Sequence, residues 1–249
     1  MRREHGFTLV ELVIVVSIVG VVAGIAIPNM LRSRMVANES ACVANLRTIK
    51  TQQLVFQLQT EVDQDWDDSG EAGLLCELSG EITPRNDDAL GACSPVYIAP
   101  RFATAGANGR GFCEASGYLY RVFLADGLET AGDDLTLGGA GNGPGQGGAM
   151  LDPDVADTYH AINLQEKCYV CYAWPLAHQG TGTRAFVVNV KSQVHATGMA
   201  NAIYDGFNAP INDYAAAYWD DGSTDTWFNN TILSGRAASD GNVWTKTDG

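Results

Sequence analysis

The sequence has 249 residues, and its 29 acidic side chains outnumber its 15 Lys and Arg, which gives a formal net charge of −14. This balance disfavours a nucleic-acid partner, because phosphate binding needs clustered Lys and Arg. The length allows one large domain or two small ones, and it is sufficient for a substantial hydrophobic core.

An apolar run near the N-terminus dominates the chain. Residues 12–27 contain no charged side chain, and about 20 apolar residues are what a membrane-spanning helix requires. Arg2 and Arg3 precede the run, and such basic residues are usually retained in the cytoplasm. We therefore expect one pass through the membrane, with the remainder of the chain outside the cytoplasm.

Glu11 is the one acidic residue at the start of this run. An ionised carboxylate inside hydrocarbon costs on the order of a few kcal/mol, so an intramembrane acid indicates a functional contact with a partner. No other residue of the span can be that partner, so we expect the partner of Glu11 to come from outside the span. The simpler alternative is a plain membrane anchor whose Glu is tolerated at the interface.

The junction between Gly6 and Phe7 differs from an ordinary secretory signal, whose apolar region spans about 7 to 15 residues before a small-residue cleavage site. Here a short basic leader ends at Gly6 and is followed by Phe7-Thr8-Leu9-Val10-Glu11 and the apolar run. This arrangement resembles the class III prepilin signal of type IV pilins and of type II secretion pseudopilins. The resemblance implies that a prepilin peptidase cleaves between Gly6 and Phe7 and methylates the new amine of Phe7.

The same resemblance assigns assembly roles to Phe7, Glu11 and Pro28. Glu11 would be the fifth residue of the mature chain, and in this family that carboxylate pairs with the N-terminal amine of a neighbouring subunit. Pro28 lies where the apolar run ends, and a proline inside a helix is expected to kink it.

We expect the helix to continue beyond Pro28, because no Gly or Pro occurs between residues 29 and 62. One helix from Phe7 to about Thr60 is predicted. Its apolar stripe, at steps of three, four and seven residues, consists of Leu31, Met35, Cys42, Leu46, Ile49 and Phe56. Its opposite face carries Arg32, Arg34, Asn38, Glu39, Arg47 and Lys50. Residues 38–49 also resemble the second half of the pilin helix.

The second half of the chain has the pattern of an antiparallel meander. The predicted strands are Gly117–Ala125, Cys168–Trp174, Arg184–Val190 and Gln193–Thr197. The stretch Gly180–Arg184 and the hairpin after it resemble the last strands of long pilin-like proteins. Residues 70–116 read as loop-rich, with a short strand at Pro95–Ala99. The fold class is therefore α+β, the type IV pilin fold, with a long N-terminal helix packed on an antiparallel sheet and a loop-rich, disulfide-containing head.

The expected organisation has four parts. Residues 1–6 are a leader peptide, residues 7–28 a transmembrane and assembly helix, and residues 29–61 an amphipathic helix that packs on the head. Residues 62–249 form a globular head with an extended C-terminal region.

The chain has six cysteines, and an even number outside the cytoplasm favours disulfides. They are Cys42, Cys76, Cys93, Cys113, Cys168 and Cys171. Six cysteines allow 15 pairings, and the sequence does not choose among them. Cys168-x-x-Cys171 could be redox-active or half of a zinc site, but no second such pair accompanies it, and structural disulfides are the favoured interpretation.

Two acidic stretches are relevant to cation binding. Asp63–Gly70 ends the helical pattern, and such a charge run is more typical of a solvated loop than of a calcium site. Asp220, Asp221 and Asp225 are the best calcium candidates, because calcium takes about 6 to 8 oxygen ligands. No other cofactor is expected.

The C-terminal tail is rich in aromatic residues, which either pack on the sheet or form an exposed contact surface. They are Tyr204, Phe207, Tyr214, Tyr218, Trp219, Trp227, Phe228 and Trp244. No nucleophile elbow, zinc-protease motif or nucleotide-binding loop occurs. We therefore expect no catalytic residues, and we interpret the chain as the substrate of a peptidase and not as an enzyme.

The resemblance implies a structural subunit of an extracellular type IV pilus. Such a subunit waits in the bacterial inner membrane with its head outside the cytoplasm, and it reaches the cell surface in a helical homo-oligomeric filament. Its partners are the prepilin peptidase, the inner-membrane assembly platform and the assembly ATPase, and its uses include adhesion, motility and DNA uptake. Two alternatives stay open: a pseudopilin of a type II secretion system, and a membrane-anchored binding module that does not polymerise.

Overall fold

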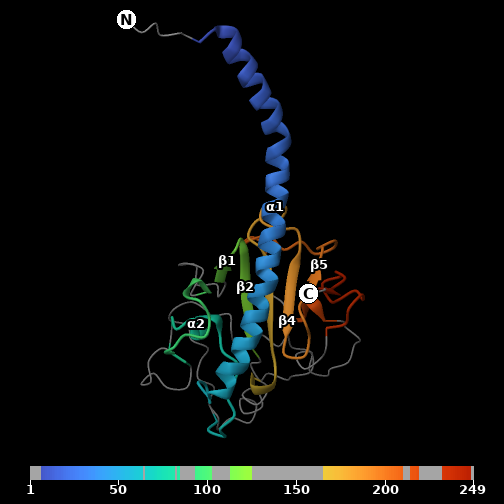
Figure 1. Cartoon of the computed structure of the whole chain (residues 1–249). Coiled ribbons are helices and arrows are strands. Elements are labelled where there is room, and N and C mark those ends of the chain that lie inside the picture. Colours follow the sequence, from blue (N-terminus) through green and yellow to red (C-terminus); the bar gives the residue numbers. More distant parts are fainter. Residues whose placement is uncertain are drawn as a thin grey trace, which may run out of the picture.

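The computed structural model describes residues 7–63, 65–81, 83–84, 93–102, 113–124, 165–209, 214–218 and 232–247. Within these ranges a long helix, α1 (Leu9–Leu58), lies along one face of a six-stranded sheet. Its upper half projects from the head and its lower half lies on it (Figure 1). This is the α+β architecture expected from the sequence.

Helix α1 begins at a reciprocal cap. The Thr8 hydroxyl accepts a hydrogen bond from the Glu11 N–H at 3.3 Å, and the Glu11 carboxylate accepts one from the Thr8 N–H at 2.9 Å. The helix then continues for 50 residues, without a break at Pro28, and ends at Leu58. Its projecting half curves away from the line of the packed half (Figure 1).

The sheet is a simple meander in which each strand pairs antiparallel with the next one along the chain. The strands are β1 (Cys113–Ala115), β2 (Tyr118–Leu124), β3 (Tyr169–Pro175), β4 (Ala185–Asn189), β5 (His195–Thr197) and β6 (Thr245–Lys246). The predicted meander over β2 to β5 is confirmed. The two short edge strands β1 and β6 were not predicted, whereas β5, which is as short as β1, was recognised as the second strand of the hairpin after β4.

The first core fills the space between α1 and the sheet. Cys42, Leu46, Ile49 and Phe56 from the helix are fully buried there, against alternate residues of the strands. The strand residues on this side include Tyr118, Tyr120, Val122, Cys171, Phe186 and Val188. The predicted helical stripe is therefore confirmed for its lower part. Its upper end is not buried, because Leu31 lies above the head with 54% of its surface exposed.

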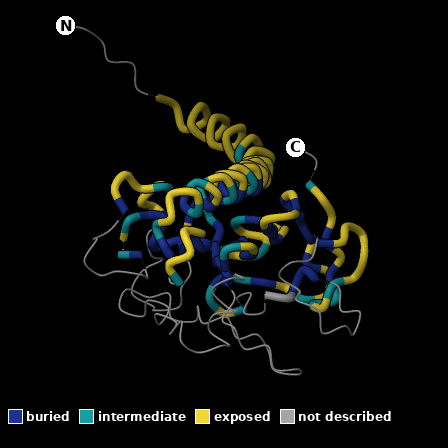
Figure 2. Tube along the Cα trace, turned by 90° about the horizontal axis from the view of Figure 1, so that it is seen from below, coloured by how far each residue is buried: buried dark blue, intermediate teal, exposed yellow. Residues whose placement is uncertain are grey.

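The second core covers the other face of the sheet. Strand residues such as Leu119, Tyr172 and Trp174 pack there against the C-terminal region, which supplies Tyr218 and Trp244. Hydrogen bonds fix this packing; the Trp174 indole N–H donates to the Gly206 carbonyl at 2.8 Å, and the Asn189 amide donates to the Tyr218 hydroxyl at 2.8 Å. The head therefore has three layers, and Figure 2 shows that burial is confined to it while the projecting helix is exposed.

The structure corrects two expectations about local conformation. Pro95–Ala99 is not a strand, because the N–H groups of Tyr97 and Ile98 both donate to the Leu78 carbonyl at the end of the short helix α2 (Leu75–Leu78). Glu39 does not lie on the exposed face of α1, because only 7% of its surface is accessible.

The expected disulfides are absent as well. All six cysteines lie within the described residues, all are buried, and no S–S bond joins any two of them. Cys171 faces the first core and Cys168 the second. Since residues three apart in an extended segment point to opposite faces, these two cysteines cannot act together as a redox pair or as half of a zinc site.

Candidate functional site

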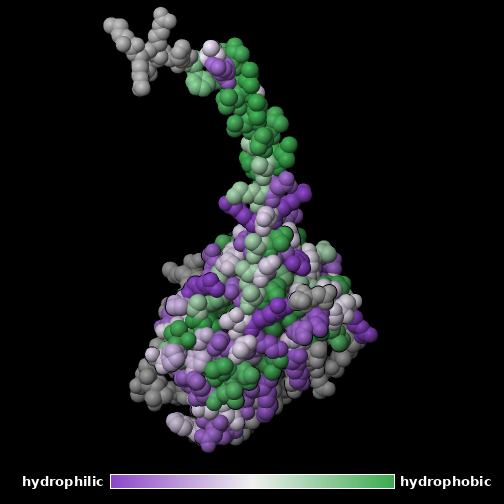
Figure 3. Space-filling model, in the orientation of Figure 1, coloured by the Kyte–Doolittle hydropathy of each residue, from purple (hydrophilic) through white to green (hydrophobic). Residues whose placement is uncertain are grey.

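The projecting half of α1 is the most unusual surface of the molecule. The exposed large apolar side chains between Phe7 and Leu31 each have between 51% and 82% of their surface accessible to solvent. Figure 3 shows this segment as a continuous hydrophobic rod above a mixed head. Among the described residues, α1 is the one helix that is long and apolar enough to span a membrane, and an 18-residue stretch of it has a mean hydropathy of 2.8. Apolar surface of this extent indicates a contact with lipid or protein.

Glu11 lies at the free end of this rod and has a partner within its own chain. The Glu11 Oε2 atom accepts hydrogen bonds from the Thr8 hydroxyl at 2.7 Å and from the Thr8 N–H at 2.9 Å. The expectation that the span itself offers no partner is therefore wrong. The signal was present in the sequence, because Thr followed three residues later by Glu is the pattern of a capping box.

Phe7 and Pro28 lie within the described residues, whereas Gly6 and the three calcium candidates do not. Phe7 precedes the helix with 82% of its surface exposed, which leaves its backbone accessible. Pro28 lies within the projecting half. Gly6 lies outside the described residues, and so do the calcium candidates Asp220, Asp221 and Asp225.

A polar junction joins α1 to the start of β4. The Glu39 carboxylate accepts hydrogen bonds from the N–H and hydroxyl of Thr183, both at 2.9 Å, and it pairs with the Arg184 guanidinium at 2.8 Å. The Asn38 side-chain amide donates to the Thr181 carbonyl at 2.9 Å. Two stretches that the sequence analysis singled out separately, residues 38–49 and Gly180–Arg184, thus meet in space.

Gly182 is required at this junction. A Cβ atom at this position would lie 2.0 Å from the hydroxyl of Tyr118, far inside any tolerable contact. The close approach allows the Tyr118 hydroxyl to donate to the Arg184 carbonyl at 3.1 Å. The head is therefore joined to the helix by hydrogen bonds and an ion pair just below the projecting half.

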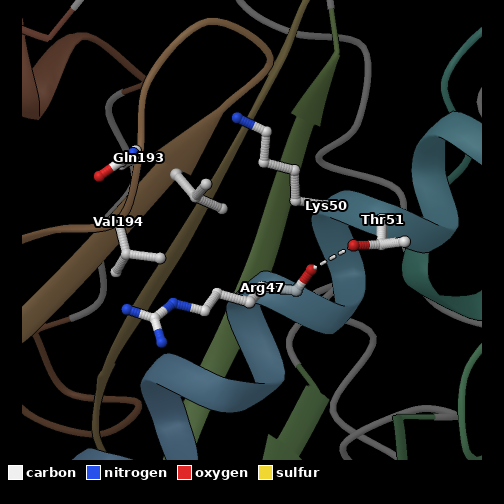
Figure 4. A pocket seen from close by; sticks show the side chains of 6 residues that line it. Arg47, Lys50, Thr51, Gln193 and Val194 are labelled. Carbon is white, nitrogen blue, oxygen red and sulfur yellow. Dashed lines mark hydrogen bonds between the residues drawn. The ribbon is translucent and has the colours of Figure 1, made fainter. Parts of the chain in front are cut away.

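A hollow of about 510 Å³ lies beside α1 lower on the head (Figure 4). Its lining consists of Arg47, Lys50, Thr51, Val188, Gln193 and Val194. The Lys50 ammonium donates to the Ser192 carbonyl at 2.8 Å, and burial lowers the pKa of Lys50. The lining includes no carboxylate, thiol or imidazole, so this hollow offers no acid–base pair for catalysis.

The cysteines do not form a reactive centre. Burial raises the pKa of the Cys76, Cys93 and Cys168 thiols to about 12 and raises those of Cys42 and Cys171 as well. Thiols of this kind are protonated at neutral pH, and the thiolate is the reactive form. The described cysteines therefore contribute apolar packing.

The acidic stretch after α1 is more organised than the sequence indicated. One carboxylate oxygen from each of Asp63, Asp65 and Asp67 lies within 4.8 Å of the other two. Among the described residues this is the group with the geometry to hold a metal ion.

Comparisons with known proteins identify relatives of the N-terminal region. Residues 1–27 match the prokaryotic N-terminal methylation motif. The chain is 37% identical over 91 residues to the type IV major pilin protein PilA of Myxococcus xanthus, which covers 36% of this chain and 40% of that protein. It is 36% identical over 86 residues to the type IV wide pilus major component PilA4 of Thermus thermophilus, covering 34% of this chain and 62% of that protein.

A third relative is a secretion protein. The chain is 32% identical over 57 residues to the type II secretion system core protein G of Dickeya chrysanthemi, which covers 23% of this chain and 37% of that protein. No solved structure matches. The chain thus spans between about two fifths and three fifths of the length of the two pilins it matches. The resemblance to type IV pilins and pseudopilins inferred from the N-terminal residues is confirmed.

Proposed function

We propose that this type IV pilin-like chain is the structural subunit of an extracellular pilus filament and assembles through the projecting half of α1. The observation that carries the proposal is an exposed apolar helical rod with Glu11 at its free end, continuous with a helix that packs on the folded head. The match of residues 1–27 to the methylation motif and the similarity to two pilus components support it.

The exposed rod explains why such a subunit needs both a membrane and copies of itself. Burying one Val, Leu or Ile side chain yields about 1.5 to 3 kcal/mol relative to water. The rod therefore resides in the inner membrane before assembly, with the head outside the cytoplasm. In the filament the rod packs against the rods of neighbouring subunits, so its contacts with lipid are replaced by contacts with protein.

The processing and assembly partners follow from this role. A prepilin peptidase cleaves between Gly6 and Phe7 and methylates the Phe7 amine, and an inner-membrane platform with its ATPase inserts the subunit into the filament. The chain has no catalytic activity of its own in this proposal. Glu11 leaves its bonds to Thr8 and pairs with the Phe7 amine of a neighbour, so that one buried charge pair fixes the axial register.

Filament yield tests the proposal. Cells that express the chain as their only pilin should shed filaments visible by electron microscopy, and Glu11→Ala should reduce their yield while the membrane fraction retains the subunit. Glu114→Ala, at an exposed carboxylate of the head, is the control for loss of one acid. Normal filament yield from Glu11→Ala would contradict the pairing role.

A pseudopilin of a type II secretion system is the second candidate, and the similarity to core protein G favours it. It predicts no long surface filaments and a defect in protein secretion when the gene is deleted. For a membrane-anchored binding module that recognises a ligand through its aromatic tail, Tyr204, Tyr218 and Trp244 offer no surface, because they are buried against the sheet. Trp219, Trp227 and Phe228 of that tail lie outside the described residues.

A further inference from the structure

The loop that follows α1 gathers carboxylates that the assembly role does not use. Asp63, Asp65 and Asp67 lie at alternate positions, and their oxygens approach within 4.8 Å of one another. The backbone satisfies two of them: Asp63 accepts hydrogen bonds from the N–H groups of Asp67 and Asp68, each at 3.2 Å, and Asp67 accepts one from the N–H of Ser69 at 2.8 Å.

Asp65 differs from its two neighbours. Both of its carboxylate oxygens are covered, and neither accepts a hydrogen bond. The neighbouring carboxylates of Asp63 and Asp67 add to the cost of keeping this carboxylate covered. A covered charge without a partner is strongly unfavourable, so the geometry calls for a positive group beside Asp65.

Glu166 brings a fourth carboxylate from a distant part of the chain. The loop and the segment before β3 are joined by a hydrogen bond from the Ala72 N–H to the Gln165 carbonyl at 3.0 Å, and the Gln57 side chain donates to the Glu166 carbonyl at 2.8 Å. Only 10% of the Glu166 side chain is exposed, and its Oε1 atom is covered and accepts no hydrogen bond.

The three aspartates lie near enough to Glu166 for their charges to act on it. Burial and then the charges of Asp67, Asp65 and Asp63 raise the pKa of Glu166 to about 7. The cation beside it is Lys167, whose ammonium lies 3.9 Å from Oε2 and whose side chain is 60% exposed. One solvated ammonium at this distance does not neutralise four carboxylates.

We propose that Asp63, Asp65 and Asp67 bind a calcium ion and that the carboxylate of Glu166, on the neighbouring segment, moves in as a fourth ligand when the ion is bound. All four groups are hard oxygen donors, which Ca²⁺ and Mg²⁺ prefer and which Zn²⁺ seldom uses without nitrogen or sulfur ligands. Calcium accepts irregular coordination by several carboxylates, whereas magnesium demands a near-ideal octahedron and keeps most of its waters. Asp67 lies at the exposed edge, where water can complete the coordination shell.

The ion would connect the end of α1 to the segment that enters β3. It would therefore stabilise the lower end of the head, at the opposite end of α1 from Glu11. This inference does not depend on whether the chain forms a pilus.

Calcium titration of the full chain in detergent micelles tests the site. Calorimetry should show one site with a Kd of about 10⁻⁴ to 10⁻³ M, the range of extracellular calcium modules. Trp66 lies in the loop with 77% of its surface exposed, so it should sensitise the luminescence of Tb³⁺ bound in place of calcium.

Asp65→Asn and Glu166→Gln should each weaken calcium binding about tenfold or more. Asp68→Asn removes an acid from the same loop but not from the site, and it should bind calcium like the unaltered chain.

Thermal unfolding separates a ligand from a merely structural acid. In EGTA, Asp65→Asn should unfold at the same temperature as the unaltered chain or at a higher one, because the substitution removes an uncompensated charge. Added calcium should raise the unfolding temperature of the unaltered chain but not that of Asp65→Asn. No saturable binding up to about 10 mM calcium would overturn the proposal. Unchanged calcium affinity in both Asp65→Asn and Glu166→Gln would also overturn it. Equal affinity of the unaltered chain for magnesium and calcium would do the same, and so would calcium binding that is lost only on substitution of Asp220, Asp221 or Asp225.

Discussion

The hydroxyl of Thr8 donates a hydrogen bond to the carboxylate of Glu11 at 2.7 Å, and the backbone N–H of the same Thr8 donates a second one at 2.9 Å. The acid at the start of the apolar rod is therefore already held in the single subunit. In the proposed filament it exchanges these bonds for the amine of another subunit, so Thr8 both protects the carboxylate in the membrane and competes for it during assembly.

Thr8→Ala should loosen the first turn of α1. Replacing an N-cap Thr by Ala costs about 1 kcal/mol, which corresponds to amide exchange roughly fivefold faster in the first turn. Hydrogen exchange of the full chain in micelles measures this at the Glu11 amide. Thr8→Ser keeps the hydroxyl and is the matched control. Equal protection of the Glu11 amide in Thr8→Ala and the unaltered chain would show that the cap contributes nothing.

Gly6→Val should prevent removal of the leader. A branched side chain at the residue before the cleaved bond would block a peptidase that accepts only a small residue there. Coexpression with a prepilin peptidase should leave Gly6→Val at its full mass, while the unaltered chain loses residues 1–6 and gains a methyl group on Phe7. Intact-mass spectrometry detects both changes, and efficient cleavage of Gly6→Val would count against the proposed signal.

Arg184→Met should destabilise the head by about 1 to 3 kcal/mol. Glu39 is buried, and the substitution leaves its carboxylate without a cation and removes the guanidinium from over the ring of Phe186. Denaturant unfolding in micelles measures the loss. Arg32→Met, on the exposed part of α1, removes the same charge and should change the free energy of unfolding by less than about 0.5 kcal/mol. Similar effects of the two substitutions would refute the junction's contribution.

The sequence predicted those features that depend on local periodicity. The buried part of the helical stripe repeats every 3.6 residues and the strands β2 to β5 alternate every two, and both were located close to their observed bounds. Glu39 was misplaced because its partners Thr183 and Arg184 lie more than 140 residues away along the chain, as the separations of 144 and 145 show. A helical wheel assigns such a charge to solvent when its partner is unknown.

The acidic loop was underestimated for the same reason. Alternate aspartates after a helix look like a solvated turn, and Glu166 is not distinguished by any motif. Only the folded chain brings the segment before β3 beside the loop and covers the oxygens of Asp65. Strand β6 likewise depends on a distant neighbour, because it pairs with β5, which lies far earlier in the chain.

Cys168 and Cys171 should not form a disulfide with each other. They face opposite cores, and residues three apart in a strand have Cα atoms about 10 Å apart, beyond the limit of roughly 7 Å for an unstrained bridge. Peptide mapping of purified chain without reduction should find no peptide cross-linked between these two positions. Such a peptide, recovered from correctly folded protein, would mean that β3 begins after Cys171.

The pH dependence of stability should report the state of Glu166. Because burial and the neighbouring aspartates raise its pKa to about 7 in the folded chain, the folded state binds more protons than the unfolded state between about pH 4.5 and 7. Stability measured in EGTA should therefore fall as the pH rises through this window, by on the order of 1 to 3 kcal/mol. The lowered pKa of His195 acts in the opposite direction, so Glu166→Gln serves as the reference. The difference between the two chains isolates the glutamate.

Calcium should reverse this trend. A bound cation favours the ionised carboxylates and competes with the proton on Glu166, so the stabilisation by calcium should increase as the pH rises from 6 to 8. Denaturant unfolding at fixed calcium concentration over this range measures it, with Glu166→Gln again as the reference. If calcium stabilised the chain equally at both ends of the range, no proton would be displaced from Glu166, and the glutamate would not be a ligand.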